Sequence, residues 1–581
     1  MTQRRGRPMD RRLRVRGWLR TQTPLHVGGV SLDPAEALPV AVDGQDRVYV
    51  PGTSLAGVLR AWMRGSDPGT DRLDDLWGVE DAKTGSGQAS RVVVRDAVIA
   101  TTTGTDGDGI PNEPLRSRAL PVVHGVGIDR VTGAAASAFL YARTVVPPGH
   151  YLSFEVDIET TEAHLARDRA RLHAMLTALR SEEIGVGAAN GKGFGVVTLM
   201  PSPLDVHEHD FTGRAGLLAF LGGEPERFDE TRVDERAADL PARRDLLAVR
   251  LRWKPEAPVM VRAAGEGAVV KTLPLTTEIG PDTLKLTLSG SSIKGALRSH
   301  AELIERTARG LDAPSPPIQD EADGTDDHAA ARRHAEAFLK QLDALDAVRF
   351  LFGAARREPE GGHHDPEAAR REPEATHHEP KAARDESEVA RLEAEVARRE
   401  PEVAPSSYPW GAGAMTVHEC VSETAIPSDV WDIVVNGAPS DGDDTKRPAL
   451  PPSVRDALAA RGLDQADHVA IDRWTGGAAD QLLFSVLEPH GVDWEPIRLT
   501  VDLTRLGDHR DVALALLLLL LRDLEQRRVP LGGMVNRGFG DVTIEGIEFS
   551  GNGWTAETTL ADALRHGDLA SAWREYAGGT R

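Results

Sequence analysis

Cysteine is nearly absent from this chain of 581 residues, since Cys420 is the only one. That excludes an internal disulfide framework and a cysteine-rich zinc site. It is typical of a reducing compartment, so we expect a cytoplasmic protein. Long apolar runs are missing too, because the longest, residues 512–521, covers only about half of a membrane span. The arginine-rich N-terminus is not followed by an apolar stretch, so the sequence predicts neither a signal peptide nor a membrane segment.

Aromatic side chains are also scarce, and acidic residues outnumber basic ones. The net charge is −22, and aromatic residues make up 5% of the chain. A surplus of acid excludes an indiscriminate nucleic-acid binder, because nonspecific affinity comes from neutralised phosphates. So few aromatic residues define no clear stacking platform for bases. Any surface that binds nucleic acid must therefore be formed by locally gathered basic residues.

Basic residues gather on two predicted strands. Residues 12–20 alternate, with Leu13, Val15 and Leu19 on one face and Trp18 among basic residues on the other; residues 247–254 alternate likewise. A half-buried strand with a solvated basic face explains either segment alone. Two such strands, each opening a repeat, favour a surface that tracks phosphates through Arg14, Arg16, Arg250 and Arg252.

A hexapeptide occurs twice, as Ile-Asp-Arg-Val-Thr-Gly from Ile128 and as Ile-Asp-Arg-Trp-Thr-Gly from Ile471. After each copy comes a small-residue stretch and then apolar alternation that ends in a turn, which predicts a strand, a hairpin and a return strand. An Asp-Arg pair with a Thr-Gly turn is not a catalytic set. A salt-bridged turn that fixes the register of a hairpin explains each copy equally well, so the duplication is the stronger signal.

Three further motifs recur in the same order: Pro51–Arg60 with Ser289–Arg298, Leu76–Gly78 with Leu351–Gly353, and Gly191–Gly195 with Asn536–Gly540. The distance between copies grows along the chain, so the second repeat must carry two insertions. The first, at about 308–345, begins as an acidic loop and continues as a helical stretch. The second, at about 355–405, is a seven-residue array interrupted by prolines and without an apolar seam, for which we expect disorder rather than a coiled coil. Its histidine pairs lack supporting ligands, so we expect no metal site.

A turn and a helix N-terminus open both copies of the Pro51–Arg60 motif. A helix N-terminus offers free backbone N–H groups and the positive end of the helix dipole, which suits a phosphate. Ordinary capping explains either copy alone. The residues that we expect at the phosphate are Gly52, Thr53, Ser54 and Arg60 in the first repeat and Ser291, Ser292, Lys294 and Arg298 in the second.

A glycine-rich loop precedes the last strand of each repeat. The stretch 184–195 superficially resembles a dinucleotide fingerprint, but a predicted helix comes before it and a strand after it, which is the reverse of a Rossmann loop. The copy at 531–540 also lacks the glycine spacing. Glycines allow a ligand to approach the backbone closely. Lys192 and Arg537 at the centres of the two loops favour a phosphate chain as that ligand.

Together these motifs, with the strand that leads to His26, resemble those of the RAMP superfamily of CRISPR-associated proteins. More narrowly, they resemble tandem backbone subunits of type III (type III-D-like) effector complexes. The resemblance covers about 12–200 and 246–549. It implies an α+β fold with two ferredoxin-like (RRM-like) domains in tandem, crRNA held by basic residues, and a thumb-like hairpin inserted into the guide–target duplex. That hairpin would follow Gly133 or Gly476, or lie in the loop after Gly29. The motif positions His26, Arg130 and Arg473 are then also expected to bind RNA.

The chain departs from the family pattern in two respects. The lysine of the helix motif is replaced by Ala56 in the first repeat and kept as Lys294 in the second. The catalytic aspartate of type III backbone subunits is replaced by Ala37 and Thr272. If the chain cleaves RNA, the nearest acids are therefore Asp33 first and Glu36 second, acting as base or as ligands of Mg²⁺ or Mn²⁺. The second repeat offers only the more distant Glu266 and Glu278, so we expect no cleavage there.

Three functions remain open. The first is a noncatalytic scaffold that binds crRNA and pairs it with target RNA, beside a large polymerase-like subunit, other RAMP backbone subunits and a small subunit. The second is the same subunit acting also as a metal-dependent endoribonuclease, and the third is a nucleotide-binding enzyme that uses the glycine-rich loops. No tightly bound cofactor is expected. The predicted domains are 1–204, an acidic linker at 205–245, 246–549 with both insertions, and a C-terminal tail or helix at 550–581.

Overall fold

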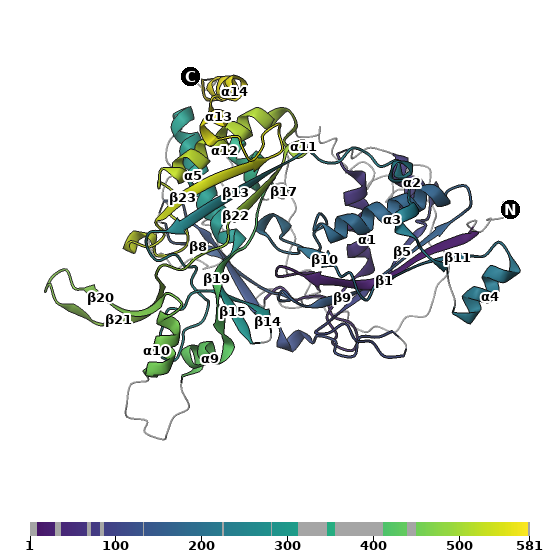
Figure 1. The fold of residues 1–581 in the computed structure, drawn as a ribbon. Coiled ribbons are helices and arrows are strands. Elements are labelled where there is room, and N and C mark those ends of the chain that lie inside the picture. Colours follow the sequence, from purple (N-terminus) through teal and green to yellow (C-terminus); the bar gives the residue numbers. More distant parts are fainter. Residues whose placement is uncertain are drawn as a thin grey trace, which may run out of the picture.

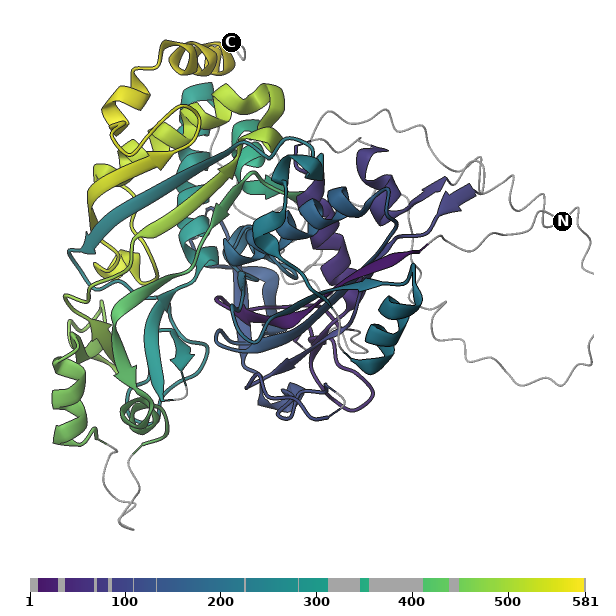
Figure 2. The same ribbon diagram turned by 45° about the vertical axis from the view of Figure 1, so that its right-hand side comes forward.

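A computed structural model describes residues 9–29, 37–66, 71–81, 86–107, 109–131, 133–223, 226–280, 282–311, 345–354, 411–437 and 449–578. They form a mixed α+β protein with several antiparallel sheets, in which an N-terminal and a C-terminal body lie side by side (Figures 1 and 2). Each body has its own large hydrophobic core. We call these bodies unit 1 (residues 11–210) and unit 2 (residues 246–550).

Unit 1 is built around the central strand β1 (Arg11–Thr21). One edge of β1 pairs with β9 (Tyr151–Thr160), and the other pairs with β10 (Val197–Leu199) and β11 (Asp205–Asp210). Beyond β9 lie β5 (Val92–Val94) and β6 (Ala97–Ala100), and β6 pairs with β2 (Tyr49–Val50). Helices α1 (Gly52–Arg64) and α3 (Leu165–Arg180) share a core with the apolar face of β1 through Leu13, Val15, Leu55, Leu59, Leu172 and Leu176.

Unit 2 repeats this plan around the central strand β13 (Leu246–Pro255). β22 (Ile497–Asp502) and β23 (Val542–Ser550) pair with its two edges, and β18 (Met415–Val417) lies beyond β22. Helices α5 (Gly290–Arg309) and α12 (Arg510–Glu525) pack onto the same core. The sheets of the two units therefore have the same strand order. The last strand of each unit pairs with one edge of the first strand, and the two strands that lie between them in sequence follow on the other edge.

A hairpin projects from each unit, and the duplicated hexapeptide forms its turn. In unit 1, β7 (Val122–Ile128) pairs with β8 (Ala135–Thr144); in unit 2, β20 (Leu463–Ile471) pairs with β21 (Ala478–Pro489). Figure 1 shows β20 and β21 extending well beyond the rest of unit 2. From the sequence we expected the strand after the motif to pair with the next strand along the chain. In unit 1 that next strand is β9, which instead pairs with β1 and β5 in the main sheet. The hairpin partner comes before the motif.

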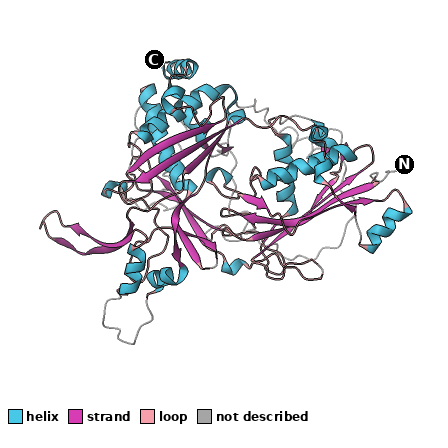
Figure 3. Cartoon of the chain, viewed as in Figure 1, coloured by secondary structure: helices cyan, strands magenta, loops and turns pink. Residues whose placement is uncertain are grey.

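Smaller elements complete the units, as the distribution of helices and strands in Figure 3 shows. Unit 2 has a three-stranded sheet of β14 (Thr276–Gly280), β15 (Thr283–Leu288) and β19 (Cys420–Pro427). Helices α13 (Leu560–Leu564) and α14 (Gly567–Gly578) pack on the core of unit 2. The other short elements are α2 (Asp74–Trp77), β3 (Val79–Asp81), β4 (Ser86–Gln88), α4 (Arg214–Gly222), β12 (Glu226–Arg227), α7 (Asp346–Phe352), β16 (Gly353–Ala354), β17 (Gly411–Ala412), α9 (Ser428–Asn436), α10 (Pro452–Ala459) and α11 (Leu503–Leu506).

Two details differ from the sequence prediction. Residues 205–245 were expected to be a linker, yet they begin with β11, which extends the sheet of unit 1 by pairing with β1. Trp18 was placed on the solvated face of β1, but it is buried and meets Tyr151 of β9 edge to face. Most of both insertions in the second repeat lies outside the described residues. Among the helices that the structure describes, none is long and apolar enough to cross a membrane.

Candidate nucleic-acid interface

The two glycine-rich loops have the same backbone conformation. Ala189 and Met534 are left-handed, with φ of 64° and 60°, and they precede short 3-10 turns at Asn190–Lys192 and Val535–Arg537. Gly193 and Gly538 end these turns with φ of 86° and 88°. This region favours glycine because a Cβ would strain the backbone. The loops are thus structurally equivalent, as the repeat predicts.

Each loop carries a basic side chain that lies over an aromatic ring of the neighbouring hairpin. The Lys192 ammonium is 5.2 Å from the ring centroid of Tyr141 on β8, and its Nζ donates to the Tyr141 hydroxyl at 2.8 Å. The Arg537 guanidinium is 5.0 Å from the ring of Phe484 on β21. A cation near an aromatic ring is attracted by the ring quadrupole. Units 1 and 2 therefore repeat one basic–aromatic pair.

An aspartate organises the turn of each hairpin. The Asp129 carboxylate accepts from the backbone N–H of Val131, and that of Asp472 accepts from Trp474 and Thr475. These bonds hold the turn in a fixed shape. At the tip of the unit 2 hairpin, Trp474 is 96% exposed.

The first loop receives protein backbone where the sequence favoured a phosphate chain. A Cβ built on Gly193 would lie 2.8 Å from the Glu419 nitrogen, and one on Gly290 would lie 2.4 Å from the Lys192 carbonyl oxygen. Lys294 Nζ donates to the carbonyl oxygens of Gly191 and Met415 at 3.0 and 2.6 Å. Burial, with the nearby charges of Arg298 and Lys192, lowers the pKa of Lys294 to about 8. The loop of unit 1 is thus packed into the N-terminus of α5.

Ser289 caps α5 by accepting from the Ser292 N–H, as predicted, whereas α1 begins differently. There the Gly52 N–H donates to the Asp96 carboxylate at 2.7 Å, and a Cβ on Gly52 would lie 2.3 Å from the Val94 carbonyl oxygen. One N–H of the predicted phosphate seat in unit 1 is thus taken by a carboxylate. Thr53 and Ser291, one residue further along each helix, remain exposed.

The basic strands differ in what their side chains contact. Arg14 forms a two-point ion pair with Asp157, its Nε 2.6 Å from a carboxylate oxygen, and Arg16 pairs with Glu155. Burial of the apolar side of β13 follows the predicted alternation, and Arg250 and Arg252 are on the exposed side. Arg252 pairs with Glu548, so the exposed Arg250 offers the more accessible charge of the two.

The remaining predicted residues are placed as follows. The His26 ring is buried and bonded to the Thr144 carbonyl oxygen, and burial lowers its pKa, so it belongs to the interior of unit 1. Arg60 donates to the Gly78 carbonyl, and Arg298 to Gly353 and Glu302. Arg473 is exposed beside Trp474. Ser54 is half-buried in the first turn of α1.

Asp33 and Glu36 lie outside the described residues. Thr272, at the second position where the family pattern has an aspartate, is buried and exchanges backbone hydrogen bonds with β21. Glu266 is near Arg262, and Glu278 is on β14. Within the described part of the chain, no three acidic, histidine or cysteine side chains gather in a way that could hold a metal ion.

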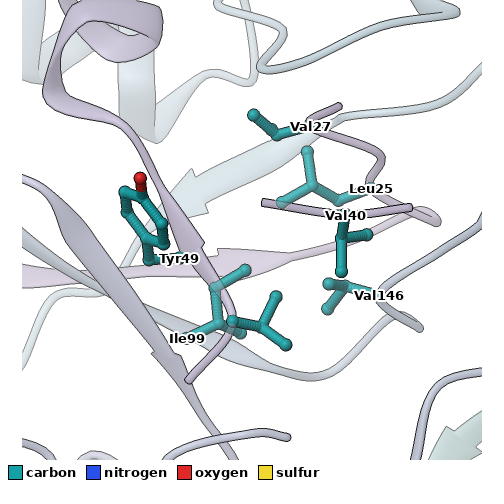
Figure 4. Close-up of a pocket in the computed structure, with 7 residues that line it drawn as sticks. Leu25, Val27, Val40, Tyr49, Ile99 and Val146 are labelled. Carbon is teal, nitrogen blue, oxygen red and sulfur yellow. The ribbon is translucent and has the colours of Figure 1, made fainter. Parts of the chain in front are cut away.

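A hollow in unit 1 is lined by apolar side chains (Figure 4): Leu25, Val27, Val40, Val48, Tyr49, Ile99 and Val146. It has no room for a water molecule, and all of these side chains except Tyr49 belong to the buried core of unit 1. It is therefore a packing feature of the core. It cannot hold a nucleotide.

A sequence profile of the RAMP superfamily matches residues 18–198 and 269–543. The chain belongs to the RAMP superfamily. The two matches fall on units 1 and 2, so the protein contains two RAMP regions in tandem, and membership implies a CRISPR-associated, RNA-binding role in general. A search among curated proteins found no match.

Several residues of these RAMP units escaped sequence reasoning. Tyr141 and Phe484 occupy matching places after the duplicated hexapeptide, so aligning the two strands would have paired them. Trp474 lies within the motif itself. Glu302 is almost completely buried on α5 and accepts from Arg130 Nε at 2.8 Å, a contact between RAMP units that no spacing rule reveals.

Proposed function

We propose that this chain is a crRNA-binding backbone subunit of a type III effector complex, of the type III-D-like kind that joins RAMP units in one chain. The observation that carries the proposal is the basic–aromatic pair repeated in both units, Lys192 with Tyr141 and Arg537 with Phe484. A cation at this place can meet a phosphate, and a phosphate contact does not read sequence. A subunit that serves many guides needs this property.

The strand order supports ferredoxin-like, RRM-like units. In each unit, the first strand is central, the last strand lies on one side of it, and the two middle strands lie on the other, with two helices on one face. The projecting hairpins fit the thumb of the family, and the exposed Trp474 would then meet the guide–target duplex. Target RNA and the large, small and other backbone subunits are the proposed partners, in the cytoplasm.

RNA affinity of a double variant tests this function. Lys192→Ala with Arg537→Ala in the full chain should weaken binding of two single-stranded RNAs of unrelated sequence about equally, because phosphate contacts do not depend on bases. Each lost contact should lower the slope of log affinity against log salt by about 0.7. Fluorescence anisotropy across a salt series measures both effects.

The matched control is Arg232→Ala with Arg565→Ala, which removes two exposed arginines from other surfaces. It should leave affinity and salt slope close to those of the wild type. A loss confined to one RNA sequence, or an equal loss in the control, would contradict the proposed contacts.

A further inference from the structure

The chain contains one complete junction between RAMP units. On one side are the glycine-rich loop 185–195 and the hairpin turn 129–134 of unit 1, which we call the donor face. On the other side are residues 290–302 of α5 and the segment 417–419 of unit 2, which we call the acceptor face. The junction shows which surfaces of two such units are complementary.

Two charged side chains of the acceptor face bind the donor face. Lys294 donates to the Gly191 carbonyl of the loop at 3.0 Å. Glu302 is 1% exposed and accepts from Arg130 of the hairpin turn, while Arg298 also donates to it. Glu302 keeps Arg298 as a partner on its own helix, and Lys294 keeps the Met415 carbonyl, so the contacts across the junction add to bonds that unit 2 already has. Charge-assisted bonds of this kind favour a partner of matching charge and disfavour one of like charge.

Unit 2 has its own donor face with the same backbone, and this face is open. Among the described residues, nothing lies within 4 Å of a Cβ built on Gly538, whereas Gly193 meets the backbone of unit 2. Arg473 takes the place of Arg130 and is exposed, beside the 96% exposed Trp474. Unit 2 thus presents the surface that a further RAMP unit would need in order to form a junction of the same kind.

The acceptor face of unit 1 differs at both charged positions. The first-helix motifs align with Gly52 at the place of Gly290, which puts Ala56 at the place of Lys294 and Arg64 at that of Glu302. A second copy of this chain would therefore offer no ammonium to the loop carbonyl of unit 2. It would also set Arg64 against Arg473, and like charges at an interface suppress a wrong partner.

We propose that the open donor face of unit 2 docks onto the first helix of a different RAMP chain, and not onto a second copy of this one. The partner carries a lysine in the first turn of that helix, as at Lys294, and a carboxylate two turns later, as at Glu302. The identification of the partner as a RAMP chain rests on the proposed backbone role. The charge rule rests on the junction alone, so its test uses no RNA.

Sedimentation velocity of nuclease-treated, RNA-free full chain tests the rule at concentrations up to about 50 μM, where weak contacts become visible. The wild type should remain a monomer. The variant Ala56→Lys with Arg64→Glu should form concentration-dependent head-to-tail chains. A head-to-tail contact that does not close into a ring leaves a free face at each end, so further copies can be added. Adding Arg473→Glu to this variant should return it to a monomer.

A second variant avoids any change in the half-buried helix α1. Arg473→Glu alone lies on an exposed turn and would face Arg64 of another copy, so it should raise self-association above that of the wild type. Wild-type self-association that Arg473→Glu abolishes would overturn the proposal, since a second copy would then be the partner. The proposal would also be overturned if the double variant folds but stays monomeric and the Arg473→Glu variant does not self-associate either. If the proposed backbone role is wrong, the RNA-binding measurements will show it, and the sedimentation results will not change.

Discussion

Single residues at the junction between the units have unusual titration behaviour. His418 lies in the segment that packs against the loop of unit 1, its Nε2 3.2 Å from the Thr500 hydroxyl. Burial, with the nearby charge of Arg498, lowers the pKa of His418 to about 4. Desolvation raises the pKa of the adjacent Glu419. The junction therefore keeps His418 neutral in a range where a free histidine is charged.

This predicts a loss of stability in mild acid. Between about pH 6.5 and about pH 4 the unfolded chain binds a proton at His418 that the folded chain does not. The contribution of this group is therefore fully present above pH 6.5 and is lost as the pH falls toward 4. Calorimetry at pH 7 and pH 4.5 should show a greater loss for the wild type than for His418→Gln, with a difference on the order of 2 kcal/mol. Equal losses in both proteins would mean that His418 is not held neutral.

Residue contacts also mark the limit of sequence reasoning. Alternation correctly placed Leu247, Val249 and Arg250 on opposite faces of β13. It could not reveal that Arg14 pairs with Asp157, because the carboxylate comes from a strand more than a hundred residues away. Nor could it show that a carboxylate occupies the Gly52 N–H or that backbone fills the first glycine-rich loop. Local patterns predict which face a side chain takes; the tertiary partner depends on strand order.

Elements were predicted better than their partners. The sequence indicated the strands around β1 and β13, the helices α1, α3 and α5, and the hairpin motif, because periodicity and turn residues are local signals. It missed that the strand before the hexapeptide is the hairpin partner and that β11 belongs to a sheet. Both errors concern which strand pairs with which, and long-range pairing leaves no local trace.

Described residues on either side of the seven-residue array pair with each other in one small element. β16 (Gly353–Ala354) pairs with β17 (Gly411–Ala412), just as β3 pairs with β4 after the equivalent motif of unit 1. Replacing residues 356–409 by a short glycine-containing turn should therefore leave the melting temperature within about 2 °C of the wild type and RNA affinity unchanged. Differential scanning calorimetry and anisotropy measure these. A large drop in melting temperature would show that the segment stabilises the fold.

At the scale of the whole molecule, one chain presents two RAMP units in the same order and orientation of elements. The loop of unit 1 is packed into unit 2, while no described residue packs against Gly538 in the loop of unit 2, so the two loops differ in their surroundings. The basic–aromatic pair occurs once in each unit. A strongly acidic protein thereby keeps its basic contacts at repeated places, which suits one extended RNA better than many scattered ones.

The central claim, that this chain holds crRNA as a backbone subunit, is tested most directly by the RNA that it carries. The full chain should be purified from cells that express a CRISPR array, and the bound RNA extracted and sequenced. We expect an absorbance ratio at 260 and 280 nm above that of protein alone, and small RNAs that share a repeat-derived 5′ segment followed by many different guides. Protein free of RNA, or fragments of cellular RNA without that shared segment, would contradict the account.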